Sequence, residues 1–281
     1  MFGKLITFEE VGKLQGVSLS FLFSLLFVGS LYVWPDKHNR DHPKTIKNRT
    51  IRITIASILS CCLLYFSASP SLNDKSGQTL FKYIGIRSTS LPQAVLCPSI
   101  LLFLLFLGPI FNLLVDGDFS TYLVGQIDFQ DIKVVRNLII APFFEELVFR
   151  GCMIPLLYPS FSNWSMLLAP LFFGIAHIHH AYALYVSQTC RVSDIILMTI
   201  FQTFYTTIFG VLSSFIFIRT NHLLAVCISH SFCNLMGFPD LESVFSHKYK
   251  IPICFMYCLG LFLFLYTLYP LTNPLIFNKF S

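Results

Sequence analysis

The sequence predicts an all-α, polytopic integral membrane protein with about eight transmembrane helices. Of its 281 residues, 55% are hydrophobic and only 12% are charged, and the mean hydropathy is +0.69. Soluble domains carry about twice that share of charged residues. Several apolar runs also approach the roughly 20 residues that a helix needs to cross the hydrocarbon core of a bilayer. Backbone groups in lipid must hydrogen-bond within their own segment, so we expect these runs to be helices.

Eight segments approach the length of a membrane span. We expect residues 1–281 to form a single membrane domain whose chemistry lies in a core at residues 134–240. Two of the segments, 163–180 and 221–238, are short and polar enough to be tilted or half-buried, so we expect about six to eight spans. The eight segments lie at about residues 17–34, 51–68, 94–115, 134–158, 163–180, 195–218, 221–238 and 251–270.

We expect the first segment to be a retained span, because it is long and no small-residue cleavage site follows it. The connection after it, Pro35 to Arg52, is strongly basic. Positive charge gathers in cytoplasmic loops, which favours a cytosolic position for this connection. The functional alternative is contact with anionic lipid, worth about 1 kcal/mol per basic residue near the surface. The basic residues are Lys37, Arg40, Lys44, Lys47, Arg49 and Arg52.

Charge and cysteine content argue against several classes of protein. A formal net charge of +5, interrupted by long apolar runs, does not indicate a nucleic-acid partner. The nine cysteines include no C-x-x-C pair and lie mostly in apolar runs, so we expect reduced packing residues rather than a disulfide framework. The chain shows no internal repeat and no matched pair of broken helices, which argues against a secondary transporter.

Charged residues interrupt the fourth segment at Ala141 to Gly151, "APFFEELVFRG". Without compensation, these three charges at mid-membrane would cost on the order of 8–10 kcal/mol. Glu146 and Arg150 are four residues apart in acid-before-base order, so we expect an ion pair on one helix face. Glu145 points about 100° away around the helix and needs a different neighbour. In the structural alternative, both carboxylates clamp the arginine.

Two further segments carry polar residues at suggestive positions. The fifth ends in "FFGIAHIHH", with His177 in the helix and His179 and His180 at the expected membrane interface. A histidine in such a place is either a satisfied core residue or a functional one. The seventh contains "ISHSFCNLMGFP", in which His230 and Asn234 share one helix face. This pair either bonds two helices together or takes part in chemistry.

Together these residues are the components of a hydrolase site. A water molecule that attacks a carbonyl must lose a proton, and a carboxylate that lines a water-filled pocket in the membrane is a suitable general base. Glu145 fits this role. The oxyanion that forms needs hydrogen-bond donors aimed at it, and one such donor is worth about 10²–10³ in rate. The N–H groups of His230 and Asn234 fit that second role.

The three motifs resemble those of the CAAX prenyl protease 2 family, within the wider CPBP group of intramembrane proteases. The family pattern is E-E-x-x-x-R, then F-x-x-x-H, then H-x-x-x-N. The resemblance extends from about Ile139 to Asp240 and includes "FQTFYTTIFGVLSSFIFIRTNHL" before the last motif. The matching residues are Glu145, Glu146, Arg150, Phe173, His177, His230 and Asn234.

The resemblance implies a protease of the endoplasmic reticulum membrane whose active site is accessible from the cytosol. Such a protease removes the last three residues of prenylated CAAX proteins, for example Ras-like small GTPases. The implied partners are these substrates and membrane lipid. The resemblance implies no cofactor and no bound metal.

The resemblance also implies roles for single residues. Glu145 and His177 would activate the water molecule, and His230 with Asn234 would hold the oxyanion. Glu146 would act as a further catalytic participant or as a supporting residue. The remaining supporting residues would be Arg150 and Phe173.

Two other interpretations stay open at the level of sequence. Glu145, His177 and His230 are also a suitable ligand set for a catalytic zinc ion, although the sequence contains no H-E-x-x-H motif. Alternatively, the protein is a non-enzymatic scaffold or transporter whose polar residues join helices or relay protons. Replacement of Glu145 distinguishes these classes, because a scaffold would keep its function.

Overall fold

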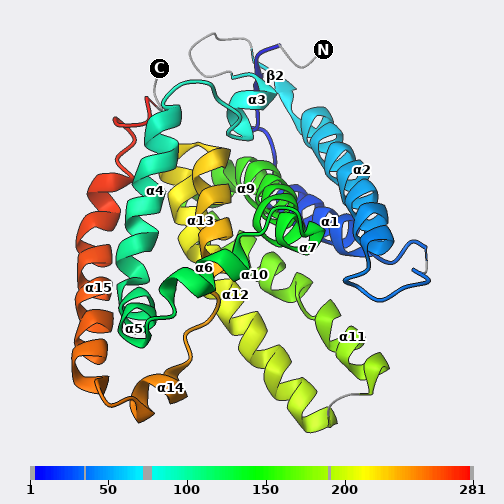
Figure 1. Cartoon of the computed structure of the whole chain (residues 1–281). Coiled ribbons are helices and arrows are strands. Elements are labelled where there is room, and N and C mark those ends of the chain that lie inside the picture. Colours follow the sequence, from blue (N-terminus) through cyan, green and yellow to red (C-terminus); the bar gives the residue numbers. More distant parts are fainter. Residues whose placement is uncertain (1–3, 35, 72–77, 189–190, 279–281) are drawn as a thin grey trace. The chain divides into compact units, whose positions relative to one another are not determined.

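The structure, a computed structural model, describes residues 4–34, 36–71, 78–188 and 191–278 and is almost entirely helical (Figure 1). Two short strands occur in these residues, β1 (Ile6–Thr7) and β2 (Ser69–Pro70), and they pair antiparallel. The predicted all-α class is confirmed.

The chain divides into two compact units, and the boundary between Phe143 and Phe144 falls inside α8 (Ala141–Glu146). The first unit comprises Met1–Arg87 and Phe144–Leu223, and the second comprises Ser88–Phe143 and Leu224–Ser281. The other helical elements of the first unit are α1 (Lys13–Ser30), α2 (Pro43–Ser67), α3 (Leu80–Tyr83), η2 (Leu147–Cys152), α9 (Met153–Phe161), η3 (Ser162–Trp164), α10 (Ser165–Ala176), α11 (His179–Ser187) and α12 (Val192–Thr220). Those of the second unit are α4 (Leu91–Leu105), α5 (Leu107–Asp116), α6 (Phe119–Gln126), α7 (Ile132–Val135), η1 (Arg136–Ile140), α13 (Leu223–Met236), α14 (Leu241–Ser246) and α15 (Lys250–Leu271).

Four helices in the described residues, α1, α2, α12 and α15, are long and apolar enough to cross a membrane. A fifth candidate span is formed by α4 and α5 together, which bend by 65° where they meet. These elements coincide with five of the eight predicted segments, and the protein is a multi-pass membrane protein.

The other three predicted segments are built differently. Residues 134–158 cover a succession of short α-helical and π-helical stretches, and residues 163–180 contain α10, of 12 residues. Residues 221–238 contain α13, of 14 residues. A helix rises 1.5 Å per residue, so α10 and α13 do not reach across a core about 30 Å thick, whereas the stretches in 134–158 follow one another without a break from Ile132 to Phe161. Hydropathy alone does not predict where a helix ends or where its hydrogen bonds change from the α-helical to the π-helical pattern.

The first unit is organised around the pair α10 and α12, which pack closely against each other. Glycines at the contact make this approach possible. A Cβ atom at Gly174 would collide with Thr207 Oγ1, and a Cβ atom at Gly210 would lie 2.8 Å from Pro170 Cβ. Small residues let helix backbones approach one another in membranes, where packing rather than the hydrophobic effect drives association.

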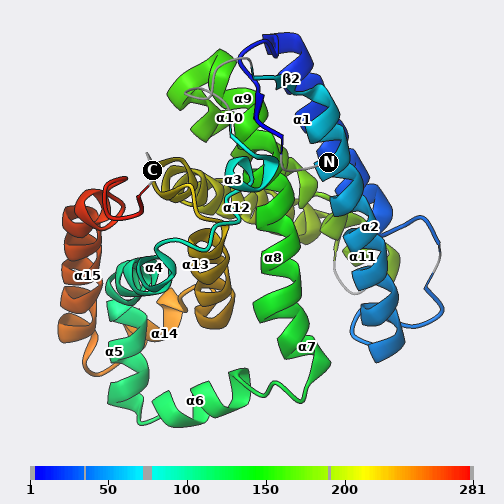
Figure 2. The same cartoon turned by 90° about the horizontal axis from the view of Figure 1, so that it is seen from above.

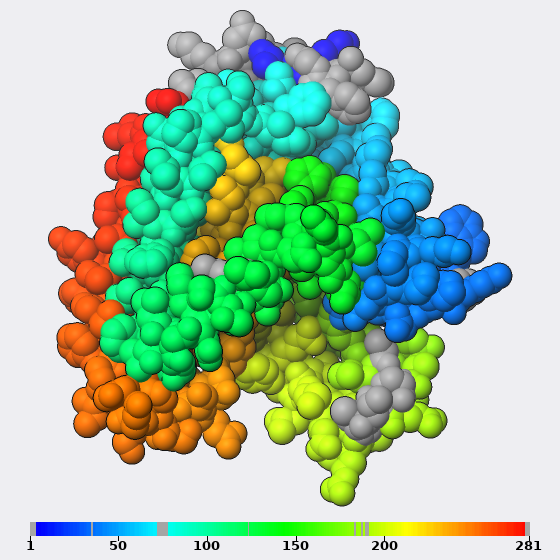
Figure 3. All heavy atoms as spheres, viewed as in Figure 1, coloured from blue at the N-terminus to red at the C-terminus, as the bar shows by residue number. Residues whose placement is uncertain are grey.

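The second unit is organised around α15, which packs along α4 and α5 (Figure 2). In the space-filling view α15 is visible in orange to red (Figure 3). Large apolar side chains on its outer side are exposed, as expected for a helix that faces lipid. They include Phe255, Phe262, Leu265, Tyr266 and Tyr269.

Candidate active site

The charged motif lies at the junction of α8 and η2. Glu146 is the last residue of α8, Arg150 lies in the π-helical η2, and both side chains are completely buried. Arg150 Nη1 donates to Glu146 Oε1 over 2.9 Å, which confirms the ion pair predicted from their spacing. π-Helical turns within longer helices are frequent at functional sites.

Two sets of neighbours stabilise this buried pair. Ser213 of α12 donates its hydroxyl to the other carboxylate oxygen, Oε2 of Glu146, over 2.8 Å. The guanidinium carbon of Arg150 lies 4.5 Å from the ring centroid of Phe173 and 5.7 Å from that of Phe209. Buried charges persist when they are paired and hydrogen-bonded, and aromatic faces add cation–π attraction. Both oxygens of Glu146 are therefore engaged in structural bonds.

Phe173 connects the ion pair to His177. The two rings lie edge to face, with centroids 4.6 Å apart. The backbone carbonyl oxygen of Phe173 lies 2.8 Å from His177 Nδ1. A carbonyl oxygen only accepts, so Nδ1 carries the proton, and in the neutral ring Nε2 is the acceptor. This bond selects the tautomer of His177 that can receive a hydrogen bond or a proton through Nε2.

The two adjacent glutamates lie in different environments. Glu146 is completely buried, whereas Glu145 is partly exposed. Successive helical residues point about 100° apart, which accounts for this contrast. Two carboxylates in unlike surroundings can take separate chemical roles. Glu145 belongs to the same unit as His177.

His230 and Asn234 lie on α13 in the second unit, where His230 is buried and Asn234 is exposed. Asn234 Nδ2 donates to the backbone carbonyl oxygen of Asn137 in η1 over 2.9 Å. Ser231 Oγ donates to the carbonyl oxygen of Leu138, also in η1, over 2.6 Å. These bonds attach one face of α13 to the backbone of η1. An amide nitrogen carries two N–H groups, so Asn234 has a second donor for a ligand.

The structure thus places the predicted residues in two sets. Within the first unit, the contacts described above join the ion pair, Phe173 and His177 into one network, while the second unit holds the other set. That the two sets meet at one water molecule stays a prediction. The first set is Glu145, Glu146, Arg150, Phe173 and His177, and the second is His230 and Asn234.

Sequence reasoning missed the contribution of α12 to this network. Ser213 hydrogen-bonds Glu146, and Gly210 leaves room for the arginine, because a Cβ atom there would lie 3.2 Å from Arg150 Nη2. The signal was a run of small residues in "FGVLSS", which is typical of helix contacts in membranes. The pattern indicates a contact surface, but it does not reveal which charged group the surface meets.

Comparisons with known proteins assign the chain to a family. Residues 130–236, which contain all three motifs, match the family described as Type II CAAX prenyl endopeptidase Rce1-like. The chain is 38% identical to the CAAX prenyl protease 2 of Homo sapiens over 264 residues, which cover 90% of this chain and 80% of that protein. It is 35% identical to the CAAX prenyl protease 2 of Arabidopsis thaliana, over 81% and 79% of the two chains.

With a relative of lower identity, the alignment covers a larger share of the relative's own length. The chain is 32% identical to the probable CAAX prenyl protease 2 of Schizosaccharomyces pombe, over 89% of this chain and 91% of that protein. No solved structure matches the chain. The identities and coverage together show that this chain belongs to the type II CAAX prenyl endopeptidases, a family of membrane-embedded hydrolases.

Proposed function

We propose that this protein removes the C-terminal tripeptide of prenylated CAAX proteins, using a water molecule activated by Glu145 and His177. Membership of the CAAX prenyl endopeptidase family supports the reaction. The observation that supports the choice of base is the contrast between neighbouring carboxylates. Glu146 is buried and bonded to Arg150 and Ser213, whereas Glu145 is partly exposed.

In the proposed mechanism, Glu145 acts as the general base. The water oxygen attacks the scissile carbonyl carbon while one water proton passes to the Glu145 carboxylate. His177 accepts a hydrogen bond from the same water through Nε2, the acceptor in the tautomer described above. The tetrahedral intermediate then collapses, the C–N bond breaks, and the leaving amine takes the proton from Glu145. A positioned acid–base group typically contributes about 10²–10⁴ in rate.

We assign the oxyanion to the second unit. His230 donates a ring N–H and Asn234 donates its second amide N–H to the negative oxygen of the intermediate. The bond from Asn234 to the Asn137 carbonyl oxygen supports this assignment, because it holds the amide in a fixed orientation before substrate binds. Donors that are already oriented stabilise a transition state without reorganisation at the moment of reaction.

The remaining motif residues act as supports. Glu146 and Arg150 form the buried pair, and Phe173 joins that pair to the imidazole through its ring and its carbonyl oxygen. We therefore assign Glu146 a positioning role rather than direct contact with substrate.

We infer that the active site is reached from the cytosol at the endoplasmic reticulum membrane, where Ras-like small GTPases are suitable substrates. α2 begins at Pro43, so only Lys37 and Arg40 of the six basic residues lie in the α1–α2 connection and the other four lie in the first three turns of α2; together they favour a cytosolic position for this end of the two helices. Tyr32, at the start of that connection, donates its hydroxyl to the carbonyl oxygen of His179 over 3.4 Å. The segment from His177 to His179, which follows the end of α10, therefore lies beside the α1–α2 connection within the first unit.

The direct test uses a farnesylated CAAX peptide and membranes that contain the protein. The wild type is expected to release a tripeptide, and Glu145→Gln is expected to abolish release because an amide cannot accept the water proton. Glu242→Gln is the matched control, since Glu242 is an exposed glutamate of α14 outside the motifs. This control should cleave at the wild-type rate.

Folding must be measured alongside cleavage, as the elution volume of each variant in detergent. An intact Glu145→Gln variant that still cleaves would remove Glu145 from the mechanism. A folded wild type that releases no tripeptide would instead favour the scaffold interpretation.

A further inference from the structure

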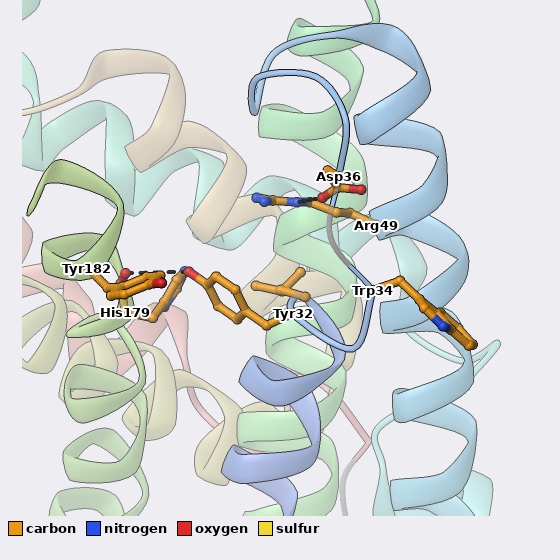
Figure 4. A pocket seen from close by; sticks show the side chains of 7 residues that line it. Tyr32, Trp34, Asp36, Arg49, His179 and Tyr182 are labelled. Atoms are coloured by element: carbon orange, nitrogen blue, oxygen red, sulfur yellow. Dashed lines mark hydrogen bonds and ion pairs between the residues drawn. The ribbon is translucent and has the colours of Figure 1, made fainter. Parts of the chain in front are cut away.

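A cavity that the proposed mechanism does not use lies in the first unit, between the α1–α2 connection and α11 (Figure 4). Its volume is ≈ 540 Å³. This is within the range of about 300–1,000 Å³ that is typical of small-ligand sites. Its polar and aromatic lining comprises Tyr32, Trp34, Asp36, Arg49, His179 and Tyr182.

The charged groups in and beside this cavity carry a net positive charge: Asp36 and Arg49 line it, and Arg52 lies behind Asp36 without lining the cavity. The carboxylate of Asp36 pairs with two guanidinium groups, those of Arg49 and Arg52. Arg52 is 9% exposed and also donates to the carbonyl oxygens of Leu31 and Trp34, over 3.0 Å in each case. Arg52 therefore holds the connection in place. One carboxylate does not neutralise two arginines, so the cavity favours an anionic ligand.

Arg49 is the group available to such a ligand. Figure 4 shows its side chain reaching from α2 to Asp36, and the contact is made by Nε, which lies 2.9 Å from Asp36 Oδ2. The Arg49 side chain is 29% exposed. Among the described residues, its two Nη groups have no hydrogen-bond partner. These are the atoms that bind phosphate oxygens in a bidentate manner.

The position of the cavity indicates a lipid rather than a soluble anion. It lies at the shared end of α1 and α2, which are both candidate membrane spans. Two aromatic rings at the cavity are largely exposed, Trp34 at 67% and Tyr182 at 63%. Exposed Trp and Tyr side chains beside a basic segment are typical of the membrane–water interface. On α11 the exposed surface continues along one helix face through Tyr185 and Val186, which is suitable for acyl-chain contact.

We propose that this cavity binds the phosphate headgroup of an anionic phospholipid, with Arg49 as the phosphate ligand and Tyr182 against the start of the acyl chains. The site is independent of the proposed hydrolysis, because none of its lining residues acts on substrate. It is nevertheless connected to the catalytic region. Tyr32 bonds to the backbone of His179, two residues beyond His177, so a bound lipid would stabilise the end of α10.

The test measures lipid binding by the purified full-length protein. Detergent-solubilised protein is titrated with phosphatidic acid or with phosphatidylcholine, and bound lipid is counted by native mass spectrometry. The wild type should prefer phosphatidic acid. Arg49→Gln should weaken that binding about tenfold, because a charge-assisted bidentate contact is lost. Lys47→Gln is the matched control, since Lys47 is an exposed cation one helical half-turn away and does not line the cavity.

The Lys47→Gln variant should bind within about twofold of the wild type, since an exposed charge outside the site contributes little. Arg49→Lys should be intermediate, because it keeps the charge and loses the planar fork. Arg49→Gln should fold, since Arg52 still pairs with Asp36, and its melting temperature in detergent checks this. If Lys47→Gln and Arg49→Gln lower the affinity for phosphatidic acid equally, the lipid is held by non-specific electrostatic attraction to basic residues, and the proposal is overturned. Displacement of the lipid by inorganic phosphate at similar concentration would also overturn it, because the site would then select a soluble anion.

Discussion

At the scale of single residues, the main feature is a buried ion pair that is held by hydrogen bonds and by aromatic rings. Glu146 is bonded to Arg150 and to Ser213, and the guanidinium lies over two phenylalanine rings. Such a cluster is stable only when complete, because removing one partner leaves the other as an uncompensated buried charge. The adjacent Glu145 is partly exposed and therefore suited to chemistry.

Arg150→Leu is expected to destabilise the protein by about 3–5 kcal/mol, because Glu146 would lose its buried ion-pair partner. The measurement is the thermal unfolding midpoint in detergent, together with the amount that accumulates in membranes. The double variant Glu146→Leu/Arg150→Leu should recover part of the loss, since it removes both charges.

The control for this prediction is Lys133→Leu, which breaks an exposed pair with Asp131. An exposed ion pair is worth at most about 1 kcal/mol, so this variant should behave nearly as the wild type. Normal accumulation and melting of Arg150→Leu would contradict the structural role assigned to the buried pair.

At the scale of elements, the close contact of α10 and α12 determines where the motif residues lie. α10 carries Phe173 and has His177 as its C-cap residue, and α12 supplies Ser213 to the glutamate. Gly210 lies at this contact, within reach of both Pro170 and the guanidinium of Arg150. The π-helical stretches η1 and η2 also carry contacts of the site, the first to α13 and the second through the arginine.

Gly210→Ala is expected to separate α10 from α12 and to lower both stability and activity. The added methyl group would lie 2.8 Å from Pro170 Cβ, and overpacking of this kind costs about 1–3 kcal/mol. Alanine favours helix by about 0.5–1 kcal/mol, which does not offset that cost. Thermal unfolding and the rate of tripeptide release measure the two effects.

Gly29→Ala is the matched control, because Gly29 is also inside a helix but a Cβ atom there meets nothing within 4 Å. That variant should be as stable as the wild type or slightly more stable. If both alanine variants behave alike, the contact between α10 and α12 does not depend on Gly210.

At the scale of the whole molecule, the motif residues come from both compact units. The base and the imidazole that we assign to water activation belong to the first unit, and the proposed oxyanion donors belong to the second. The family match covers residues from both units, since it extends from 130 to 236. The proposed mechanism therefore uses residues of both units.

The requirement for metal is also a property of the complete site. Exhaustive chelation of membranes that contain the protein is expected to leave tripeptide release unchanged, because the proposed base is a carboxylate and the proposed oxyanion donors are N–H groups. The measurement is the rate before chelation, after chelation and after zinc is added back. Activity that disappears on chelation and returns with zinc would establish the metalloprotease alternative, with His177, His230 and Glu145 as ligands.

Local spacing predicted a substantial part of the site. The Glu146–Arg150 pair follows from helix geometry, because residues four apart lie on one face whatever surrounds them. The same geometry predicts unlike environments for Glu145 and Glu146. By contrast, α10 and α13 are shorter than the predicted spans at 163–180 and 221–238, and the π-helical stretches within 134–158 were not predicted, since helix ends and π-helical turns do not follow from average hydropathy.

The sequence by itself determined the all-helical membrane class, the three motifs and the ion pair within one helical run, because composition and short-range periodicity are properties of the chain alone. The tertiary structure decided that Ser213 bonds Glu146, that Phe173 lies over Arg150, and that two segments remote in sequence, 31–49 and 179–182, line one cavity. Such contacts join elements far apart in the chain. These contacts depend on the distance between packed helices, and no short-range sequence pattern determines that distance.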